Sequence, residues 1–222
     1  MSDTIQTISR ALSADVEGIN AVSHNVANLT TPAFKSVRSI PDFGAALGSH
    51  EALQTSDGPL SQTGRSFDLA LRGSGFFITE HDGQQLLVRA GSFRRSSEGY
   101  LVSAAGDRVL TETGSVEIPD GNLRVEEDGS LWVQDQALGR LLIVDVADTQ
   151  RLTRVAGGYR YDGELKPWSG SVQQGAVEQS NVDAAEQTLR LIELTRHAES
   201  MQRAFSIYDK TMDTGINRVG DN

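Results

Sequence analysis

The sequence predicts an α+β fold in which long, coiled-coil-like α-helices at the N- and C-termini flank a central antiparallel β domain. Apolar residues recur at heptad spacing near both ends, the pattern of helices that pair with other helices. Between the ends, nineteen of the 22 glycines fall among residues 41–180, where short apolar runs alternate with turn signals. We therefore divide the chain into an N-terminal helix with the segment that follows it (1–35), an extended connector (36–64), the central β domain (65–178) and a C-terminal helix (179–222).

The first predicted helix follows from a heptad register with a positions at 5, 12, 19 and 26 and d positions at 8, 15, 22 and 29. Seven of these eight positions are apolar, and the exception is Asp15. Ser2 or Asp3 can cap the start of the helix, because a short side-chain oxygen accepts from the free backbone N–H groups there. The helix is expected to end near Asn28, since Pro32 disfavours helical geometry in the residue before it.

The middle of the chain has the pattern of strands and turns. Proline and glycine break any regular pattern over residues 36–64, which indicates an extended connector. Beyond it, short apolar runs, of which residues 141–144 are the strongest, predict strands. Asp82-Gly83 and Asp128-Gly129 lie between such runs and predict tight hairpins. The sequence therefore predicts one antiparallel β domain with a twisted, barrel-like or sandwich arrangement.

The second predicted helix begins near Asn181, where Asp183 and Glu186 have the spacing of a capping box. Its heptad register places apolar residues at all six a positions: Ala184, Leu191, Ala198, Phe205, Met212 and Val219. A second apolar set widens the surface: Leu189, Ile192, Ile207 and Ile216. One neighbouring helix does not cover both sets, so the pattern favours packing against other chains. The alternative is a monomer whose terminal helices pack against each other and against the β domain.

Composition and charge exclude several classes of protein. The formal net charge is −10; residues 1–40 are neutral and residues 181–222 carry −2, so the central part carries −8 and repels DNA or RNA. No cysteine is present, which excludes disulfides and thiolate metal sites. No apolar run approaches the roughly 18 residues that span a bilayer. The N-terminus lacks the basic and apolar regions of a secretory signal peptide, so we expect neither membrane insertion nor a cleaved signal.

Chemistry-bearing motifs do not emerge from the sequence. The four histidines, at 24, 50, 81 and 197, are scattered over different predicted elements, and none has metal-ligand spacing. No glycine cluster precedes Lys-Ser or Lys-Thr, as a phosphate-binding loop requires. We therefore predict no catalytic, cofactor-binding or metal-binding residue, no cofactor and no small-molecule substrate. The alternatives are a hydrolase that uses paired acids of the acidic β domain and a monomeric binding module.

Several segments resemble the axial proteins of the bacterial flagellum, the rod and hook family. Residues 23–35, SHNVANLTTPAFK, are similar to the family signature S-x-N-[IV]-A-N-x-x-T-x-[GA]-[FY]-K, with Ala33 at the position where glycine is commonest. Residues 63–77 and 89–93 resemble the start of the family's β domain. Residues 175–182, GAVEQSNV, are similar to the segment that leads into the C-terminal helix. These segments follow the family's order along nearly the whole chain.

The resemblance implies a structural subunit and not an enzyme. In this family the terminal helices of many subunits pack into an inner tube, the β domain forms the outer layer, and the tube is the drive shaft that transmits torque. The implied partners are copies of the chain, other flagellar rod proteins and the flagellar type III export apparatus. The implied location is the periplasmic rod of the basal body. The compact connector and the stretch 195–202 resemble the proximal rod type, and the distal rod type is the alternative.

The heptad stripes and the signature together predict an assembly interface. Phe34 is the first large apolar residue after the Pro32 turn, so we expect it to pin the connector against a helix of its own or a neighbouring subunit. Asn28 is expected at the helix end, where asparagine tolerates left-handed geometry. The predicted interface residues are Ile5, Ile8, Leu12, Ile19, Val22, Asn25, Val26, Asn28, Leu29, Phe34, Leu191, Leu194, Met201, Phe205, Tyr208 and Met212.

Overall fold

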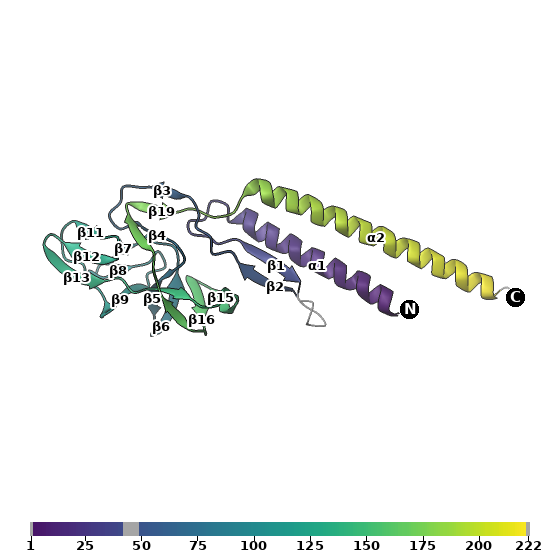
Figure 1. The fold of residues 1–222 in the computed structure, drawn as a ribbon, viewed down its shortest axis with the longest axis horizontal. Helices are drawn as coiled ribbons and strands as arrows, with labels where there is room; N and C mark the ends of the chain where they lie inside the picture. The colour runs from purple at the N-terminus through teal and green to yellow at the C-terminus, as the bar shows by residue number, and fades with distance from the viewer. Residues whose placement is uncertain (1, 42–48, 221–222) are drawn as a thin grey trace. The chain divides into compact units, whose positions relative to one another are not determined.

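The computed structural model describes residues 2–41 and 49–220, which hold two α-helices, one short 3-10 helix and nineteen strands (Figure 1). The helices are α1 (Ser2–Ala27) and α2 (Ala184–Gly220), with η1 at Thr149–Arg151. The strands are β1 (Val37–Pro41), β2 (Ser49–Leu53), β3 (Leu60–Gln62), β4 (Leu69–Arg72), β5 (Phe76–His81), β6 (Gln84–Val88), β7 (Arg94–Arg95), β8 (Leu101–Val102), β9 (Arg108–Thr111), β10 (Gly114–Ser115), β11 (Leu123–Val125), β12 (Ser130–Val133), β13 (Gln136–Arg140), β14 (Ile143–Val146), β15 (Leu152–Val155), β16 (Gly158–Tyr161), β17 (Leu165–Pro167), β18 (Ser171–Gln174) and β19 (Ala176–Glu178).

The chain folds as two compact units. The first contains α1, Val37–Ala52 and the chain from Asp183 onward, and therefore both helices and the two-stranded sheet of β1 and β2. The second contains Asn28–Ser36 and Leu53–Val182. The predicted connector contributes to both units, and its residues 42–48 lie outside the described part of the chain.

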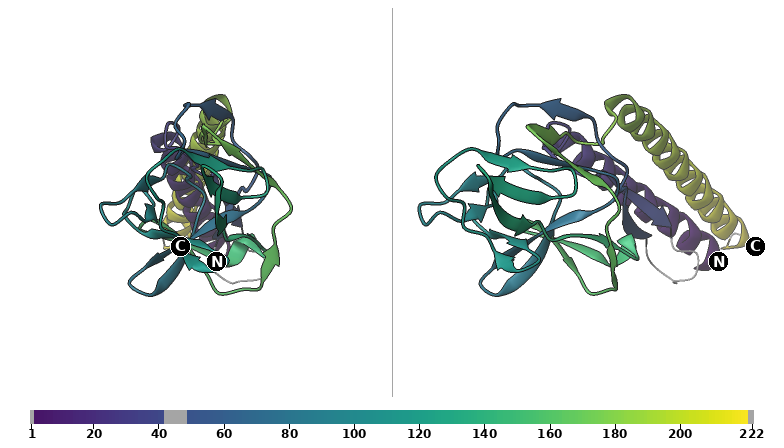
Figure 2. Two further views of the ribbon diagram at one scale, coloured as in Figure 1. Left: turned by 90° about the vertical axis from the view of Figure 1, so that its left-hand side faces the viewer. Right: turned by 60° about the vertical axis from the view of Figure 1, so that its left-hand side comes forward.

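In the first unit the two helices lie side by side and run in opposite directions, so that both chain ends are at the same end of the pair (Figures 1 and 2). Helix α1 ends at Ala27, which confirms the end predicted near Asn28. The N-cap predicted at Asp183 is also confirmed, because its Oδ1 accepts from the backbone nitrogens of Ala185 at 2.8 Å and Glu186 at 3.2 Å. Strand β1 packs along α1.

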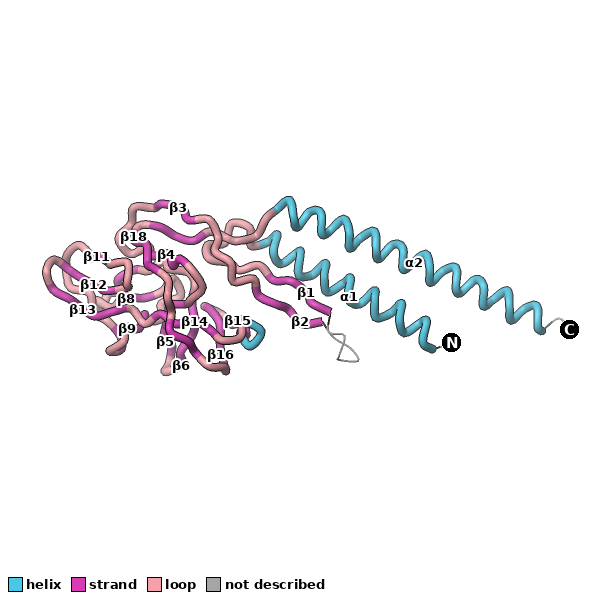
Figure 3. Tube along the Cα trace, viewed as in Figure 1, coloured by secondary structure: helices cyan, strands magenta, loops and turns pink. Residues whose placement is uncertain are grey.

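The second unit is built from short antiparallel strands, coloured magenta in Figure 3. Its largest sheet has ten strands, in the order β15-β16-β6-β5-β9-β8-β7, with β10 on β9, β14 on β5 and β17 on β14. Three smaller sheets are β11-β12-β13, β18-β4 and β19-β3. The Asp82-Gly83 hairpin is confirmed between β5 and β6: both residues have positive φ, 49° and 76°, as a type I′ turn requires.

Two apolar clusters form the core of the second unit. The larger one surrounds Phe77 and Phe93, whose rings meet edge to face with centroids 5.0 Å apart. The smaller one surrounds Phe76 and Tyr159, with ring centroids 5.7 Å apart. Phe76 and Phe77 are adjacent in β5 and point to opposite faces of the strand, so this one strand joins the two clusters.

The predicted fold class was wrong. The described chain is mostly antiparallel β, with two α-helices, of which the N-terminal one, at 26 residues, is the shorter. The strands are not confined to a domain that the helices flank, because β1 and β2 belong to the same compact unit as both helices. Strands of two to four residues, such as β7, β8 and β10, are too short to leave a periodic signal, and they form through pairing with distant segments. None of the described helices is long and apolar enough to cross a membrane.

Candidate assembly surfaces

Asn25 joins the C-terminal end of α1 to α2 and to β1 by hydrogen bonds. Its Nδ2 donates to Oε1 of Gln187 in α2 at 3.0 Å and to the carbonyl of Val37 in β1 at 2.8 Å. Its Oδ1 accepts from the backbone nitrogen of Val37 at 2.9 Å. Asn25 and Gln187 are both buried, so an apolar substitution at either position leaves polar atoms without a partner.

Further toward the N-terminus of α1, two more pairs join the helices. A β-carbon added at Gly18 would lie 3.0 Å from both δ-carbons of Leu194, so the glycine leaves the space that Leu194 fills. Nδ1 of His197 lies 2.9 and 2.8 Å from the two carboxylate oxygens of Asp15. A carboxylate only accepts hydrogen bonds, so Nδ1 is the donor in this contact. Asp15 is 5% exposed, although it is the one polar residue of the predicted stripe.

The buried face of α1 differs from the heptad register predicted from sequence. Its buried residues are Asp15, Gly18, Ala21, Val22 and Asn25. The predicted d positions 15 and 22 belong to this face, but the predicted a positions do not. Ile5 and Val26 are 43% and 46% exposed, and Leu12 and Ile19 are half-buried. The apolar a positions therefore lie on the flank of the helix pair, where α2 does not cover them fully.

In α2, as in α1, some of the apolar residues are buried or half-buried and others, at predicted a positions, are exposed. Leu194 is buried and Met201 and Tyr208 are half-buried, at steps of seven residues from Gln187. Leu191 and Phe205, both from the predicted a positions, are 40% and 43% exposed. Further large apolar side chains are exposed on the two helices: Val16, Leu189, Ile192 and Ile207.

The structure places the predicted interface residues in three groups. The buried ones are Val22, Asn25, Phe34 and Leu194. The half-buried ones are Ile8, Leu12, Ile19, Asn28, Leu29, Met201 and Tyr208. The exposed ones are Ile5, Val26, Leu191 and Phe205. Met212 lies in α2, outside the part whose side chains are described. Their role as an interface stays a prediction.

Phe34 belongs to the second unit, where it is 6% exposed. The guanidinium carbon of Arg154, in β15, lies 4.6 Å from the centroid of its ring, within the range of a cation–π contact. Arg154 Nη2 also donates to the carbonyl of Lys35 at 3.3 Å and to the hydroxyl of Tyr159 at 3.2 Å. Phe34 is thus fixed within the chain, and Asn181 N donates to its carbonyl at 3.2 Å.

Ala33, the residue before Phe34, has a φ of +57° and is 6% exposed. Its backbone nitrogen donates to the carbonyl of Glu178 at 2.8 Å, which holds it in this left-handed conformation. A β-carbon makes this conformation unfavourable by about 1–2 kcal/mol. The geometry explains why glycine suits this position of the signature.

A buried ionic cluster lies beside this turn in the second unit, around the carboxylate of Glu178 in β19. Lys35 Nζ lies 2.7 Å from Oε1, and Arg89 Nε donates to Oε2. Gly58 N also donates to Oε1, at 2.7 Å. Arg89 further pairs with Asp57, at 3.1 Å. The side chains of Lys35, Glu178 and Arg89 are at most 2% exposed, so the cluster is fully desolvated.

The two cations of the cluster satisfy their remaining donors on backbone carbonyls. Lys35 Nζ donates to the carbonyl of Ser56 at 2.7 Å. The guanidinium of Arg89 donates to the carbonyls of Leu71, Gly73 and Gly75 at 3.0, 2.8 and 2.7 Å. Burial, and then the nearby charge of Arg89, lower the pKa of Lys35 below its ordinary value. The cluster therefore gathers four segments that are distant in sequence around one carboxylate.

Asn181 joins the same segments by hydrogen bonds. Its Oδ1 accepts from the backbone nitrogen of Ser36 at 2.7 Å. Its Nδ2 donates to the carbonyls of Gln54 at 2.9 Å and Ser56 at 3.0 Å. Both motifs noted in the sequence, residues 23–35 and 175–182, thus supply side chains to one network of the second unit, Lys35 from the first and Glu178 and Asn181 from the second.

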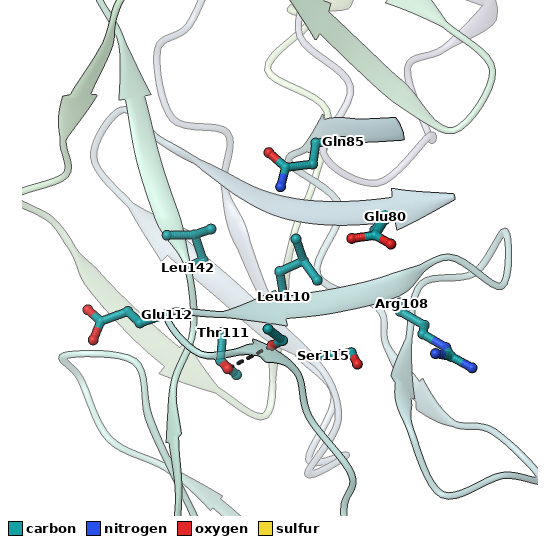
Figure 4. Close-up of a pocket in the computed structure, with 9 residues that line it drawn as sticks. Glu80, Gln85, Arg108, Leu110, Thr111, Glu112, Ser115 and Leu142 are labelled. Carbon is teal, nitrogen blue, oxygen red and sulfur yellow. Dashed lines mark hydrogen bonds between the residues drawn. The ribbon is translucent and has the colours of Figure 1, made fainter. Parts of the chain in front are cut away.

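The second unit also holds a shallow pocket of about 280 Å³ beside β9 (Figure 4). Glu80, Arg108 and Glu112 are the charged residues that line it, and Thr111 Oγ1 donates to the carbonyl of Gly114 at 2.8 Å. Among the described residues no group of three or more His, Cys, Asp or Glu side chains could hold a metal ion.

Known proteins and family models match this chain over most of its length. Residues 70–133 match the model of the flagellar hook protein FlgE/F/G D1 domain, and residues 173–218 match that of the flagellar basal body rod FlgEFG protein C-terminal. The chain is 26% identical to the flagellar basal-body rod protein FlgF of Caulobacter vibrioides, with 91% of each chain covered. It is 29% identical to the rod protein FlgG of Buchnera aphidicola from Acyrthosiphon pisum (91% and 92% covered) and 25% identical to FlgF of Mesorhizobium japonicum (99% of each). The chain is thus similar to flagellar rod and hook proteins over most of its length.

These matches confirm the resemblance seen in the sequence. The relatives are flagellar basal-body rod proteins, which are structural proteins and not enzymes. The family also supports assembly with other flagellar rod proteins and a location in the basal-body rod.

Sequence reasoning missed several residues that hold this rod-family fold together. Arg89 follows the apolar run of β6, and a charge at the end of a buried strand is a signal for a buried ion pair. Asp15 is a polar interruption in the apolar stripe of α1, and such a residue signals a polar partner on the facing helix, which here is His197. Gln187 gave no signal of its own, because an amide near a helix start is ordinarily exposed.

Proposed function

We propose that this chain is a proximal rod subunit of the FlgF type, whose terminal helices pack with those of neighbouring subunits into the drive shaft that transmits torque. The observation that carries the proposal is the apolar flank that remains exposed after α1 and α2 have paired. Leu191, Phe205, Ile5 and Val26 are all 40% or more exposed, on helices whose seam is already filled. Large apolar side chains left exposed along both helices are typical of a surface that another chain covers.

The proposed partners are copies of the chain, other flagellar rod proteins and the flagellar type III export apparatus. Passage through that apparatus would bring the chain to the periplasm without a cleaved signal peptide. The proposed division of the chain remains 1–35, 36–64, 65–178 and 179–222, with the first and last segments as the coiled-coil-forming parts of the assembly. These details rest on the family resemblance and on the apolar flank.

The test replaces one exposed apolar residue and one exposed polar neighbour. Phe205→Ser removes apolar area from the flank without opening a cavity in the chain, whereas Gln202→Ser on the same helix is the matched control. In the native bacterium, Phe205→Ser is expected to reduce swimming and the number of complete rods, with the protein present at the level of the control. Equal motility of both strains would contradict the proposed interface.

The distal rod type, FlgG, is the second candidate, because relatives of both names match the chain to a similar degree. Electron micrographs of basal bodies from a strain that lacks this chain separate the two. Loss of the rod near its base supports the proximal assignment. A rod that lacks its outer end alone supports the distal one.

A further inference from the structure

The three contacts between α1 and α2 share one register. Asn25 faces Gln187, Gly18 faces Leu194, and Asp15 faces His197. From the first pair to the second, the position falls by seven residues in α1 and rises by seven in α2. From the second to the third it falls and rises by three. These equal and opposite steps mean that all three pairs belong to one alignment of an antiparallel pair, with the spacing of a coiled-coil seam.

A seam of apolar residues alone tolerates a shift by one heptad, because such a shift keeps the same helix faces together. In this chain the shift changes every pair. In one direction Asp15 faces Arg190 and His197 faces Ile8; in the other, Asp15 faces Ala204 and His197 faces Val22. His197 loses its carboxylate in both cases.

Leu194 imposes the same alignment on steric grounds. The side chain of Leu194 occupies the space beside Gly18. A β-carbon added at Gly18 would lie 3.0 Å from both δ-carbons of Leu194. After a heptad shift it faces Ala11 or Asn25, both of which carry a β-carbon. The close approach of the helices at Gly18 is therefore available in one register alone.

We propose that Asp15 and His197 determine the register of the terminal helix pair. The close contact between Gly18 and Leu194 favours the same register on steric grounds. Asp15 is buried in the helix pair and the side chain of His197 is 51% exposed at its edge, so an alignment that separates them leaves a buried carboxylate without its donor. Register decides which exposed apolar residues of α1 and α2 lie side by side. The pair thus fixes the surface that the first unit presents to neighbouring chains. The inference concerns a single chain and does not depend on the proposed function.

Disulfide trapping measures the register directly, because the chain has no cysteine of its own. Ala11→Cys with Met201→Cys reports the alignment seen here, since these positions continue the seven-residue steps from Gly18 and Leu194. Thr4→Cys with Met201→Cys, and Ala11→Cys with Tyr208→Cys, report the two heptad shifts. A shift of seven residues moves the helices by about 10 Å, which exceeds the roughly 7 Å between Cα atoms that a disulfide tolerates.

Each reporter is placed in three backgrounds of the full chain: unchanged, His197→Asn, and Asp15→Leu with His197→Leu. The side-chain amide of His197→Asn keeps a donor near the position of Nδ1, so it is the conservative control. Oxidation is carried to equilibrium in a glutathione buffer at a concentration where the chain is monomeric. The 11–201 disulfide is expected to dominate in the unchanged chain and in His197→Asn. In the double leucine background it should fall by about fivefold, with a gain in the 4–201 or the 11–208 disulfide, which is the size of effect expected when a modest pairwise coupling is lost.

The result that overturns the proposal is an undiminished 11–201 disulfide in the double leucine background. Circular dichroism at 222 nm accompanies every sample. Leucine is a strong helix former, and Asp15→Leu replaces a buried carboxylate with an apolar side chain, so the double leucine variant should keep its helicity. If its helices melt instead, the pair acts as a general stabiliser and not as a determinant of register, and the proposal also fails.

Discussion

Arg89 and Glu178 are 89 positions apart in the sequence, and their side chains form a buried ion pair in the second unit. Glu178 also accepts from Lys35, so one carboxylate balances two desolvated cations. The pair closes the unit at a point where Asn28–Ser36, Leu53–Gly58 and β19 meet, because the partners of Glu178 come from each of these segments and from the end of β6. A change at Glu178 therefore acts on all of these contacts together.

Glu178→Gln is expected to lower the free energy of unfolding of the second unit by about 3–5 kcal/mol, because it leaves the buried Lys35 without its ion-pair partner and leaves Arg89 with Asp57 alone. Both tryptophans, Trp132 and Trp168, lie in this unit, so their fluorescence during urea unfolding reports on it. Glu164→Gln, at an exposed carboxylate, is the matched control and should change the value little. The double variant Lys35→Met with Glu178→Gln should lose less than the sum of the two single variants, since it removes the unpaired cation. Strict additivity would contradict the coupling.

Phe34→Ala is expected to destabilise the second unit in the isolated chain by about 3 kcal/mol, because it removes a ring that is 6% exposed. The exposed Phe205→Ala is the comparison, with an expected change within about 0.5 kcal/mol. Urea unfolding followed by tryptophan fluorescence measures the first, and circular dichroism at 222 nm measures the second. A stable Phe34→Ala chain that swims poorly would show instead that the ring acts between subunits.

The sequence predicted the ends of the helices but not the face that they bury. Capping at Asp183 and the turn before Pro32 are local effects, which a short window of sequence contains. The buried face of α1 passes through Gly18 and Asn25, residues that count against a seam when apolar spacing is scored. They become favourable when Leu194 fills the space at the glycine and Gln187 bonds the amide. Such matches between residues of two distant segments cannot be recognised from the apolar pattern of one helix alone.

The buried ionic cluster around Glu178 could not be predicted from the sequence for a similar reason. Lys35 and Glu178 both stand in segments that the sequence marked by resemblance, yet nothing local indicates that they are buried. A lysine is ordinarily exposed, and its burial here depends on the carboxylate and on the carbonyl of Ser56. The exposed apolar residues Leu191 and Phe205 could be named from spacing, because α2 has more apolar positions than its contact with α1 covers; their role as an interface stays a prediction.

Acid titration should reveal Asp128 as an unusually strong acid. The backbone N–H of Ser130 and the guanidinium of Arg140 lower the pKa of Asp128 from 3.8 to about 2. Because the folded pKa is below the unfolded one, the stabilisation is present above pH 3.8 and is lost as the pH falls through about 2. Asp128→Asn should therefore lower the unfolding midpoint slightly at pH 5 and not at pH 2, and solvent screening keeps the effect small. A carboxyl chemical shift that titrates near pH 4 by NMR would contradict this.

Ala33→Gly should stabilise the second unit. At a φ of +57° alanine pays a steric penalty of about 1–2 kcal/mol, which glycine does not. Glycine adds freedom to the unfolded chain, which offsets about 0.4–1 kcal/mol. The expected net gain is about 0.5 kcal/mol, read as a higher urea midpoint of tryptophan fluorescence.

Ala147→Gly is the matched control, because its φ is not positive and the substitution brings the entropic loss alone, so it should destabilise. Ala33→Val should move in the opposite direction to Ala33→Gly, since a branched side chain worsens the left-handed geometry of a buried residue. Equal destabilisation by Ala33→Gly and Ala147→Gly would show that the turn carries no strain, and the preference for glycine at this position of the signature would then need another cause.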